Sequence, residues 1–221
     1  MSVGYDRAHR SLEYTMMASH LALTLVVAKR WVATSTGWVD VALAVIMAPL
    51  SCLMADVASG VVHFLADRYG SLETPFLGPN VLRSFREHHD EPLAIVEHDF
   101  VTLTGDVCLA TVPFLGIALL VLHGDTPLER VGLAVAAFTA ALGATTSLFH
   151  KWAHAPNVPR VVGFLQRHGL LLSQARHAEH HRAPYDKAFS ITNGWADRWL
   201  HLSHWLMRME RRLGRADSPA P

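Results

Sequence analysis

The sequence has little charge and little cysteine. Only 17% of its 221 residues are charged and 51% are hydrophobic, whereas soluble globular domains carry roughly 25% charged residues. This composition argues against a disordered chain. Its 19 basic and 19 acidic residues balance, so it has no basic field to attract nucleic acid, and we expect no nucleic-acid partner. Cys52 and Cys108 both lie in apolar stretches, which argues against a disulfide framework and a cysteine zinc site.

Two metal-site signatures are also missing. The sequence contains no His-Glu-x-x-His, which argues against a zincin metalloprotease. It contains no Glu-x-x-His, which disfavours a ferritin-like carboxylate di-iron bundle. Histidine, however, is abundant: 15 residues in a chain whose mean hydropathy is +0.21. So many histidines in an apolar chain require a chemical explanation.

Long apolar stretches predict the fold. A helix needs about 20 apolar residues to cross a bilayer, and we expect spans at about 14–32, 41–66, 101–122 and 131–150. The sequence therefore predicts an all-α integral membrane protein of about four transmembrane helices, with a soluble bundle of buried helices as the alternative. We expect residues 1–13 to be an N-terminal cytoplasmic segment, 14–213 a single membrane domain and 214–221 a flexible tail.

The basic residues predict the orientation. Four spans place both termini on one side, together with the segment between the second and third spans. That side carries most of the arginines, whereas the other carries only Lys29, Arg30 and Arg130, so the first side is predicted to be cytoplasmic. Residues 158–172 and 195–213 mix aromatic, aliphatic and basic side chains, which is typical of interfacial helices; packing on a soluble subdomain is the alternative.

The histidines cluster on the predicted cytoplasmic side. His150 and His154 are four residues apart, as are His177 and His181, so each pair shares a helix face. The candidate metal ligands are His63, Asp67, His88, His89, His98, His150, His154, His177, His180 and His181. Neutral imidazole suits iron, zinc, copper and nickel, and this set exceeds the four ligands of one zinc ion. We therefore expect two ions in a histidine-rich cap.

Other polar residues have less certain roles. His9, His20, His123, His201 and His204 are interpreted as interfacial polar residues, and His168 is left open. Asp56 and Asp106 lie within predicted spans, where acids are costly and usually functional. Asp56 either orients a ligating imidazole or makes a packing hydrogen bond to a serine or threonine. Glu87 and Asp99, which adjoin His88 and His98, are further candidates to orient ligands.

Five motifs resemble one family. They are Asp56-x3-Gly60-x2-His63-x3-Asp67, Phe85-Arg86-Glu87-His88-His89, His98-Asp99-Phe100, His150-Lys151-Trp152-x-His154 and Ile191-Thr192-x-Gly194-Trp195. In this order they resemble the small membrane lipid desaturases of the plasmanylethanolamine desaturase and carotenogenesis-light-response type. The stretch from His177 to Tyr185 is also similar to the related plastid palmitate trans-desaturases.

The resemblance implies a chemistry. It implies an oxidoreductase with two iron ions and O2 as co-substrate, in which His63, His88, His89, His150, His154, His177, His180 and His181 take part. The expected substrate is a membrane phospholipid, desaturated at its ether-linked chain to a vinyl ether. A trans acyl-lipid desaturase and a lipid hydroxylase are the alternatives. A cytoplasmic electron donor, cytochrome b5-like or ferredoxin-like, is implied as a partner.

Two other classes compete with this interpretation. A metal transporter or sensor places ionisable residues near the bilayer midplane, often on broken helices, whereas these histidines lie at helix ends and in loops. A non-catalytic scaffold with a structural metal would close around one zinc ion. The alanine- and arginine-rich composition and the lack of an organelle signal favour a bacterial inner membrane.

Overall fold

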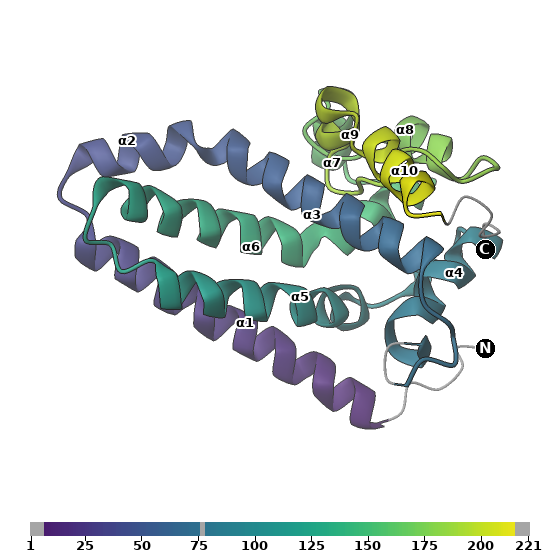
Figure 1. Cartoon of the computed structure of the whole chain (residues 1–221), viewed down its shortest axis with the longest axis horizontal. Coiled ribbons are helices and arrows are strands. Elements are labelled where there is room, and N and C mark those ends of the chain that lie inside the picture. Colours follow the sequence, from purple (N-terminus) through teal and green to yellow (C-terminus); the bar gives the residue numbers. More distant parts are fainter. Residues whose placement is uncertain (1–6, 76–77, 215–221) are drawn as a thin grey trace. The chain divides into compact units, whose positions relative to one another are not determined.

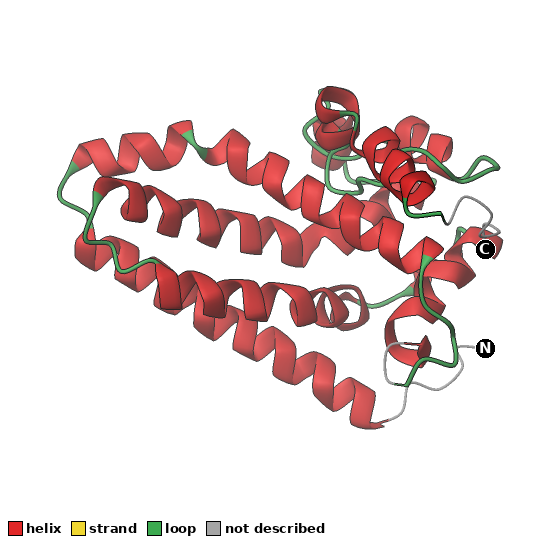
Figure 2. Cartoon of the chain, viewed as in Figure 1, coloured by secondary structure: helices red, strands yellow, loops and turns green. Residues whose placement is uncertain are grey.

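The computed structural model describes residues 7–75 and 78–214, and this part of the chain contains helices but no strand (Figures 1 and 2). The helices are α1 Arg7–Thr34, α2 Trp38–Ile46, α3 Ala48–Arg68, α4 Arg83–Asp90, α5 Phe100–Val121, α6 Pro127–His154, α7 Arg160–Arg167, α8 Gln174–His180, α9 Trp195–Leu200 and α10 Leu202–Arg212. A short π-helix, Gly78–Leu82, precedes α4, and a 3₁₀ turn, Ala94–Glu97, follows it. Residues 1–6 of the predicted N-terminal segment and 215–221 of the predicted tail lie outside the described residues.

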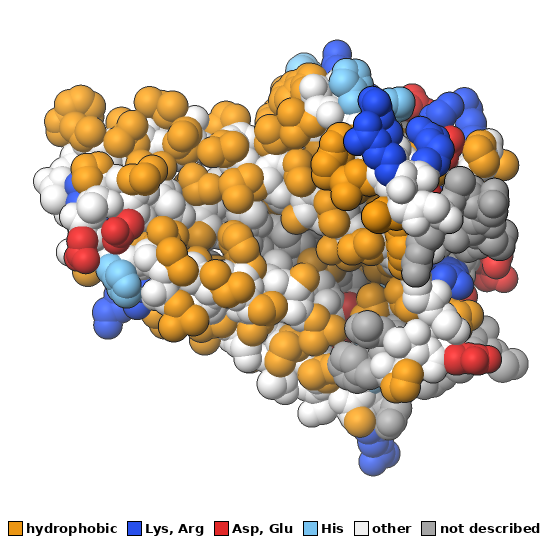
Figure 3. Space-filling view, viewed as in Figure 1, with side chains coloured by type: hydrophobic (Ala, Val, Ile, Leu, Met, Phe, Trp, Pro, Cys, Tyr) orange, Lys and Arg blue, Asp and Glu red, His pale blue; other side chains and the backbone are white. Residues whose placement is uncertain are grey.

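Four of the helices are long and apolar enough to cross a membrane: α1, α3, α5 and α6, with 28, 21, 22 and 28 residues. At 1.5 Å per residue, even the shortest is about 30 Å long, the thickness of the hydrocarbon core. Hydrophobic side chains cover much of the visible surface of the long helices (Figure 3), and Leu120 and Leu128 are 77% and 80% exposed. The prediction of an all-α integral membrane protein with four such helices is confirmed.

Two differences between the helix bounds and the expected spans change the description of the fold. Helix α1 begins at Arg7, so residues 7–13 of the expected N-terminal segment are helical and continuous with the first long helix. The expected span 41–66 is divided between α2 and α3, which are interrupted at Met47. Pro49 explains the interruption, because proline cannot donate the backbone hydrogen bond that would continue α2.

The chain divides into two compact units, whose boundaries fall inside α3 and α6. In the described residues, the first unit contains 7–55 and 100–145, and the second contains 56–75, 78–99 and 146–214. The first unit packs α1 against α5 and has a small core of Val27, Leu115, Leu133 and Ala140. Gly105 permits this approach, because a Cβ atom there would lie 2.4 Å from Glu13 Cβ.

Several buried polar groups in the first unit have partners on neighbouring helices. Arg130 Nε donates to Asp40 Oδ1 at 3.0 Å, and Arg30 donates to the carbonyls of Leu119 and Leu122. His9 is buried and its Nε2 lies 3.3 Å from Asp106 Oδ1. His9 is therefore a buried partner of the α5 carboxylate and not the interfacial polar residue that the sequence suggested.

The second unit gathers α4, α7, α8, α9 and α10 with the C-terminal turns of α3 and α6. Its largest fully buried side chain is Phe189, in the loop that joins α8 to α9. Arg68, at the end of α3, donates through Nε to both carboxylate oxygens of Glu210 on α10, at 2.7 and 2.8 Å. Gly60 on α3 lies against the same loop, because a Cβ atom there would be 2.7 Å from Ser190 Oγ. These contacts hold together the unit that contains the predicted metal-binding histidines.

Candidate metal centre

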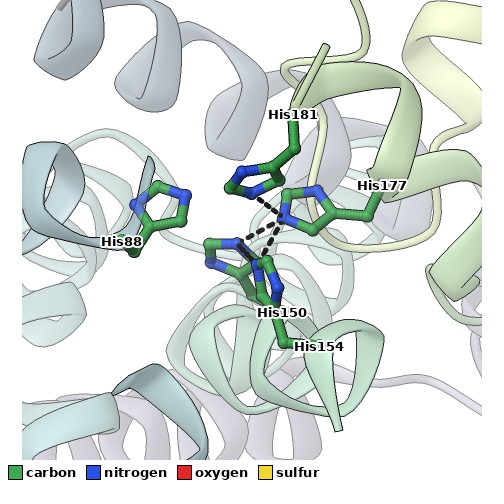
Figure 4. Close-up of side chains that lie close together, drawn as sticks. All are labelled: His88, His150, His154, His177 and His181. Atoms are coloured by element: carbon green, nitrogen blue, oxygen red, sulfur yellow. Dashed lines mark hydrogen bonds between the residues drawn. The ribbon is translucent and has the colours of Figure 1, made fainter. Parts of the chain in front are cut away.

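Five histidines of the second unit face one another, and we call them the five-histidine cluster (Figure 4). They are His88 on α4, His150 and His154 on α6, His177 on α8, and His181 directly after it. Each offers one nitrogen, and these nitrogens all lie within 4.8 Å of one another. The four-residue spacing that placed His150 and His154 on one helix face thus brings both rings to the same point.

His177 occupies the middle of this cluster. Its Nε2 lies 2.7 Å from His150 Nε2, 2.8 Å from His154 Nε2 and 3.0 Å from His181 Nε2. A neutral imidazole carries one N–H and one lone pair, so a single nitrogen cannot hydrogen-bond properly with three others. A cation shared by the lone pairs would resolve this crowding, and the donor set fits a metal that imidazole binds, such as iron.

A second group surrounds the carboxylate of Asp67, and we call it the Asp67 cluster. Asp67 Oδ2 lies 3.3 Å from the Nε2 atoms of His63, His89 and His180. His88 belongs to both groups by proximity, because its nitrogens also lie within 4.8 Å of those of His63, His89 and His180. One carboxylate and three imidazoles form a second donor set suited to a divalent metal.

Backbone carbonyls orient two imidazoles of the Asp67 cluster. His63 Nδ1 donates to the carbonyl of Phe189 at 3.1 Å, and His180 Nδ1 donates to that of Lys187 at 2.8 Å. Hydrogen bonds of this kind fix the tautomer and leave Nε2 free to ligate. Both carbonyls belong to the loop that joins α8 to α9, in which Tyr185 and Ala188 have φ of 57° and 53°. The sequence did not reveal these partners, because a carbonyl leaves no residue-type signal.

Asp56 has a role that the sequence did not predict. Its Oδ1 accepts the backbone N–H groups of Thr192, Asn193 and Gly194, and its Oδ2 accepts that of Ala196. Four backbone bonds therefore take the place of the expected bond to an imidazole, and one of them comes from Thr192, a residue of the type that the alternative interpretation named. Asp56 anchors the segment that follows the carbonyl of Phe189.

Three other predicted residues lie elsewhere. Among the described residues, neither cluster includes His98, Glu87 or Asp99. His98 instead accepts a hydrogen bond on its backbone carbonyl from Lys151 Nζ, at 2.7 Å. Glu87 is exposed, and its carboxylate lies 4.0 Å from Arg83 Nε. The sequence placed these residues close to the ligands along the chain, but the last turn of α4 directs only His88 and His89 to the clusters.

Burial favours the neutral form of three clustered histidines that lie outside the long helices, His88, His177 and His181. Burial, and to a lesser extent neighbouring histidines, lower the pKa of His88 and of His181 to about 2. The same causes, burial first, hold the pKa of His177 well below its usual value. Neutral imidazole is the form that binds metal, so these side chains need not lose a proton to ligate at neutral pH.

The fold and the site define an integral membrane protein with two groups of imidazoles that could hold metal ions. Residues 52–218 match the lipid desaturase domain family. The chain therefore belongs to the lipid desaturase family and is an oxidoreductase that acts on lipid.

Several characterised relatives cover most of the chain. It is 36% identical to a plasmanylethanolamine desaturase of Myxococcus xanthus over 96% of this chain and 75% of the relative. It is 32% identical to plasmanylethanolamine desaturase 1 of Mus musculus over 89% of this chain and 72% of the relative. It is 35% identical to the chloroplastic fatty acid desaturase 4 of Arabidopsis thaliana, over 64% of this chain and 43% of the relative. No solved structure matches it.

Proposed function

We propose that this protein is a plasmanylethanolamine desaturase, which forms the vinyl ether bond of plasmalogens. The observation that carries the proposal is the 36% identity to the Myxococcus xanthus enzyme of that name, which extends over 96% of this chain. The two histidine clusters support it, because a strong C–H bond requires a metal oxidant rather than side-chain acid–base chemistry.

The proposed reaction balances with O2 and an external reductant. One hydrogen leaves C1 and one leaves C2 of the ether-linked alkyl chain, and a C=C bond forms between these carbons. O2, two electrons and two protons, together with the two hydrogens removed, give two molecules of water. The electrons come from a one-electron carrier of the cytochrome b5 or ferredoxin class, which we place on the cytoplasmic side with the clusters.

Each cluster is assigned one iron ion. His150, His154, His177 and His181 would hold one iron, and Asp67, His63, His89 and His180 would hold the other. His88 lies near both groups and completes the set. When bound, the irons supply the O2 activation and C–H oxidation that no side chain provides.

The chain's own residues position these ligands. The carbonyls of Phe189 and Lys187 hold the rings of His63 and His180 by Nδ1, so that both Nε2 atoms face Asp67. Burial of the rings excludes water from the neighbourhood of the reacting carbons. A lipid chain entering between helices from the bilayer would reach a site built from helix ends at the depth of the glycerol.

A trans acyl-lipid desaturase is the second candidate. Its support is the 35% identity to the Arabidopsis thaliana chloroplastic fatty acid desaturase 4 over 144 residues. Because the histidine motifs of this chain resemble both branches, we take them to favour neither substrate.

Lipid mass spectrometry with acid treatment tests the proposal. Cells without their own desaturase would express the protein and receive an alkyl-glycerol precursor. We expect a new acid-labile vinyl ether phospholipid, absent with His150→Ala and His181→Ala but present with the control His204→Ala, a histidine exposed on α10. A new acyl double bond without vinyl ether would identify the second candidate instead. Neither product, from protein with iron and a reducing system, would overturn both.

A further inference from the structure

We propose that a basic cleft in the second unit binds the phosphoethanolamine headgroup of the lipid substrate, a proposal that rests on the function proposed above. The cleft has a volume of about 350 Å³ and is lined by residues from the end of α7, from α8 and from the start of α9. Figure 1 labels these three helices. Its charged lining residues are Arg167, Arg176, Arg198 and Glu179.

The charges of the cleft match a phosphate diester. Three arginines and a single glutamate line the cleft, so the lining carries an excess of positive charge that an anion would offset. Arginine binds phosphate through paired N–H groups. Glu179 and the indole of Trp195 offer a carboxylate and an aromatic surface, the two groups that recognise an ammonium ion. A zwitterionic phosphoethanolamine presents the complementary pair of charges.

The side chain of Arg176 lies in space that is open only because residue 194 is a glycine. Its side chain crosses directly over Gly194, because a Cβ atom there would lie 2.6 Å from Arg176 Nε and 2.7 Å from its Cδ. That Nε is buried and has no hydrogen-bond partner among the residues the structure describes. Gly194 has φ of 79° and donates its N–H to Asp56. The Asp56 carboxylate therefore also holds in place the backbone over which Arg176 lies.

The surroundings of the cleft suit a membrane surface. Trp195 is fixed by a hydrogen bond from Nε1 to the carbonyl of Gly169, at 2.6 Å, and its ring centroid lies 4.6 Å from that of Trp199. Phe164, Leu170 and Trp199 are 49%, 47% and 55% exposed on the elements that form the cleft. Exposed aromatic and aliphatic side chains beside arginines are typical of the headgroup region. This favours a lipid headgroup over a free phosphate.

The position along α8 connects the cleft to the reaction. Arg176 and Glu179 alternate with His177 and His180 in this helix, so one side of a single helix lines the cleft while its histidines enter the clusters. Six bonds separate the phosphorus of the headgroup from the first carbon of the ether-linked chain. Three bonds of an extended chain span about 3.5 Å, so six span roughly 7 Å, which is more than half of the 10–12 Å diameter of a helix with its side chains. A headgroup held here would leave the reacting carbons close to the histidines.

Lipid binding to the full-length protein in detergent, measured by native mass spectrometry, tests the cleft without requiring turnover. The probes are 1-alkyl-2-acyl-glycerophospholipids with phosphoethanolamine or phosphoglycerol headgroups, and the corresponding phosphatidic acid. We expect Arg176→Gln to weaken binding of all three at least tenfold. Glu179→Gln should reduce the preference for phosphoethanolamine over phosphatidic acid. The control Arg160→Gln removes an exposed charge of α7 outside the cleft and should change neither quantity.

Several outcomes decide the proposal. If Arg176→Gln fails to fold, Arg198→Gln tests the same cleft, because Arg198 is exposed on α9. Equal lipid affinity in the cleft variants and Arg160→Gln would overturn the proposal. So would slower reduction by the electron donor at unchanged lipid affinity, which would assign the cleft to that partner. If the wild type binds lipid as expected but forms no vinyl ether, the proposed function fails and the cleft stands.

Discussion

Asp56 Oδ2 accepts the backbone N–H of Ala196 at 2.8 Å, although the two residues are 140 positions apart. With the three bonds to Oδ1, this contact ties α3 to the segment that begins α9. This segment directly follows the stretch that carries the carbonyl of Phe189, which orients His63. One carboxylate therefore connects the ligand-bearing helix to the loop that positions its histidine.

Replacing Asp56 should loosen the loop and lower metal retention. In Asp56→Ala, four buried N–H groups lose their acceptor, and each unsatisfied group costs about 1–3 kcal/mol. Asp56→Asn keeps one acceptor oxygen and should be milder. We expect iron per chain, measured on purified protein by elemental analysis, to decrease from wild type to Asn to Ala. Glu73→Gln is the matched control, because Glu73 is an exposed carboxylate of the same unit. An unchanged iron content per chain in Asp56→Ala would show that Asp56 contributes to packing only and not to metal retention.

The sequence predicted the elements better than their connections. Apolar runs of about 20 residues and histidines spaced four apart are local signals. The runs located the long helices, and the spacing predicted that His150 and His154 share one helix face. The partners of Asp56 are backbone groups far along the chain, which no residue pattern marks. The same holds for the carbonyls that orient His63 and His180. His98 was predicted as a ligand but lies in neither cluster, because proximity along the chain does not determine the direction in which a loop orients a side chain.

The two clusters should lose metal separately. We expect His154→Ala to lower bound iron toward one per chain, and Asp67→Asn to do the same through the other cluster, because each substitution removes a ligand from one donor set only. Losing a partner that orients a metal ligand commonly weakens metal affinity 10–100-fold, and losing a ligand itself should weaken it at least as much. Mössbauer spectra of iron-57 protein would distinguish which iron remains. Complete loss of both ions in each variant would instead indicate one cooperative site.

The Arg68–Glu210 pair should act as a buried clamp between α3 and α10. The side chains are only 7% and 1% exposed, so removing one partner leaves an uncompensated buried charge. Breaking such a pair typically costs about 3–5 kcal/mol, whereas replacing both partners by apolar residues is often neutral. We expect Glu210→Leu to lower the apparent Tm in detergent strongly, and Arg68→Met with Glu210→Leu to recover most of it. A double variant as unstable as the sum of the single ones would contradict this coupling.

Gly105 should be essential for the contact between α1 and α5, whereas Gly116 on the same helix should not. A Cβ atom at Gly105 would lie 2.4 Å from Glu13 Cβ and 2.8 Å from Glu13 Cα, but one at Gly116 would meet nothing within 4 Å. Because the obstacle at Gly105 includes backbone, α1 has to move, and overpacking of this kind costs about 1–3 kcal/mol. Close approach of membrane helices depends on such small residues. We therefore expect Gly105→Ala to lower the apparent Tm in detergent, and Gly116→Ala to leave it unchanged or raise it slightly, since alanine favours a helix by up to about 1 kcal/mol over glycine. Equal Tm values for the two variants would show that α1 can shift away from α5 without loss of stability.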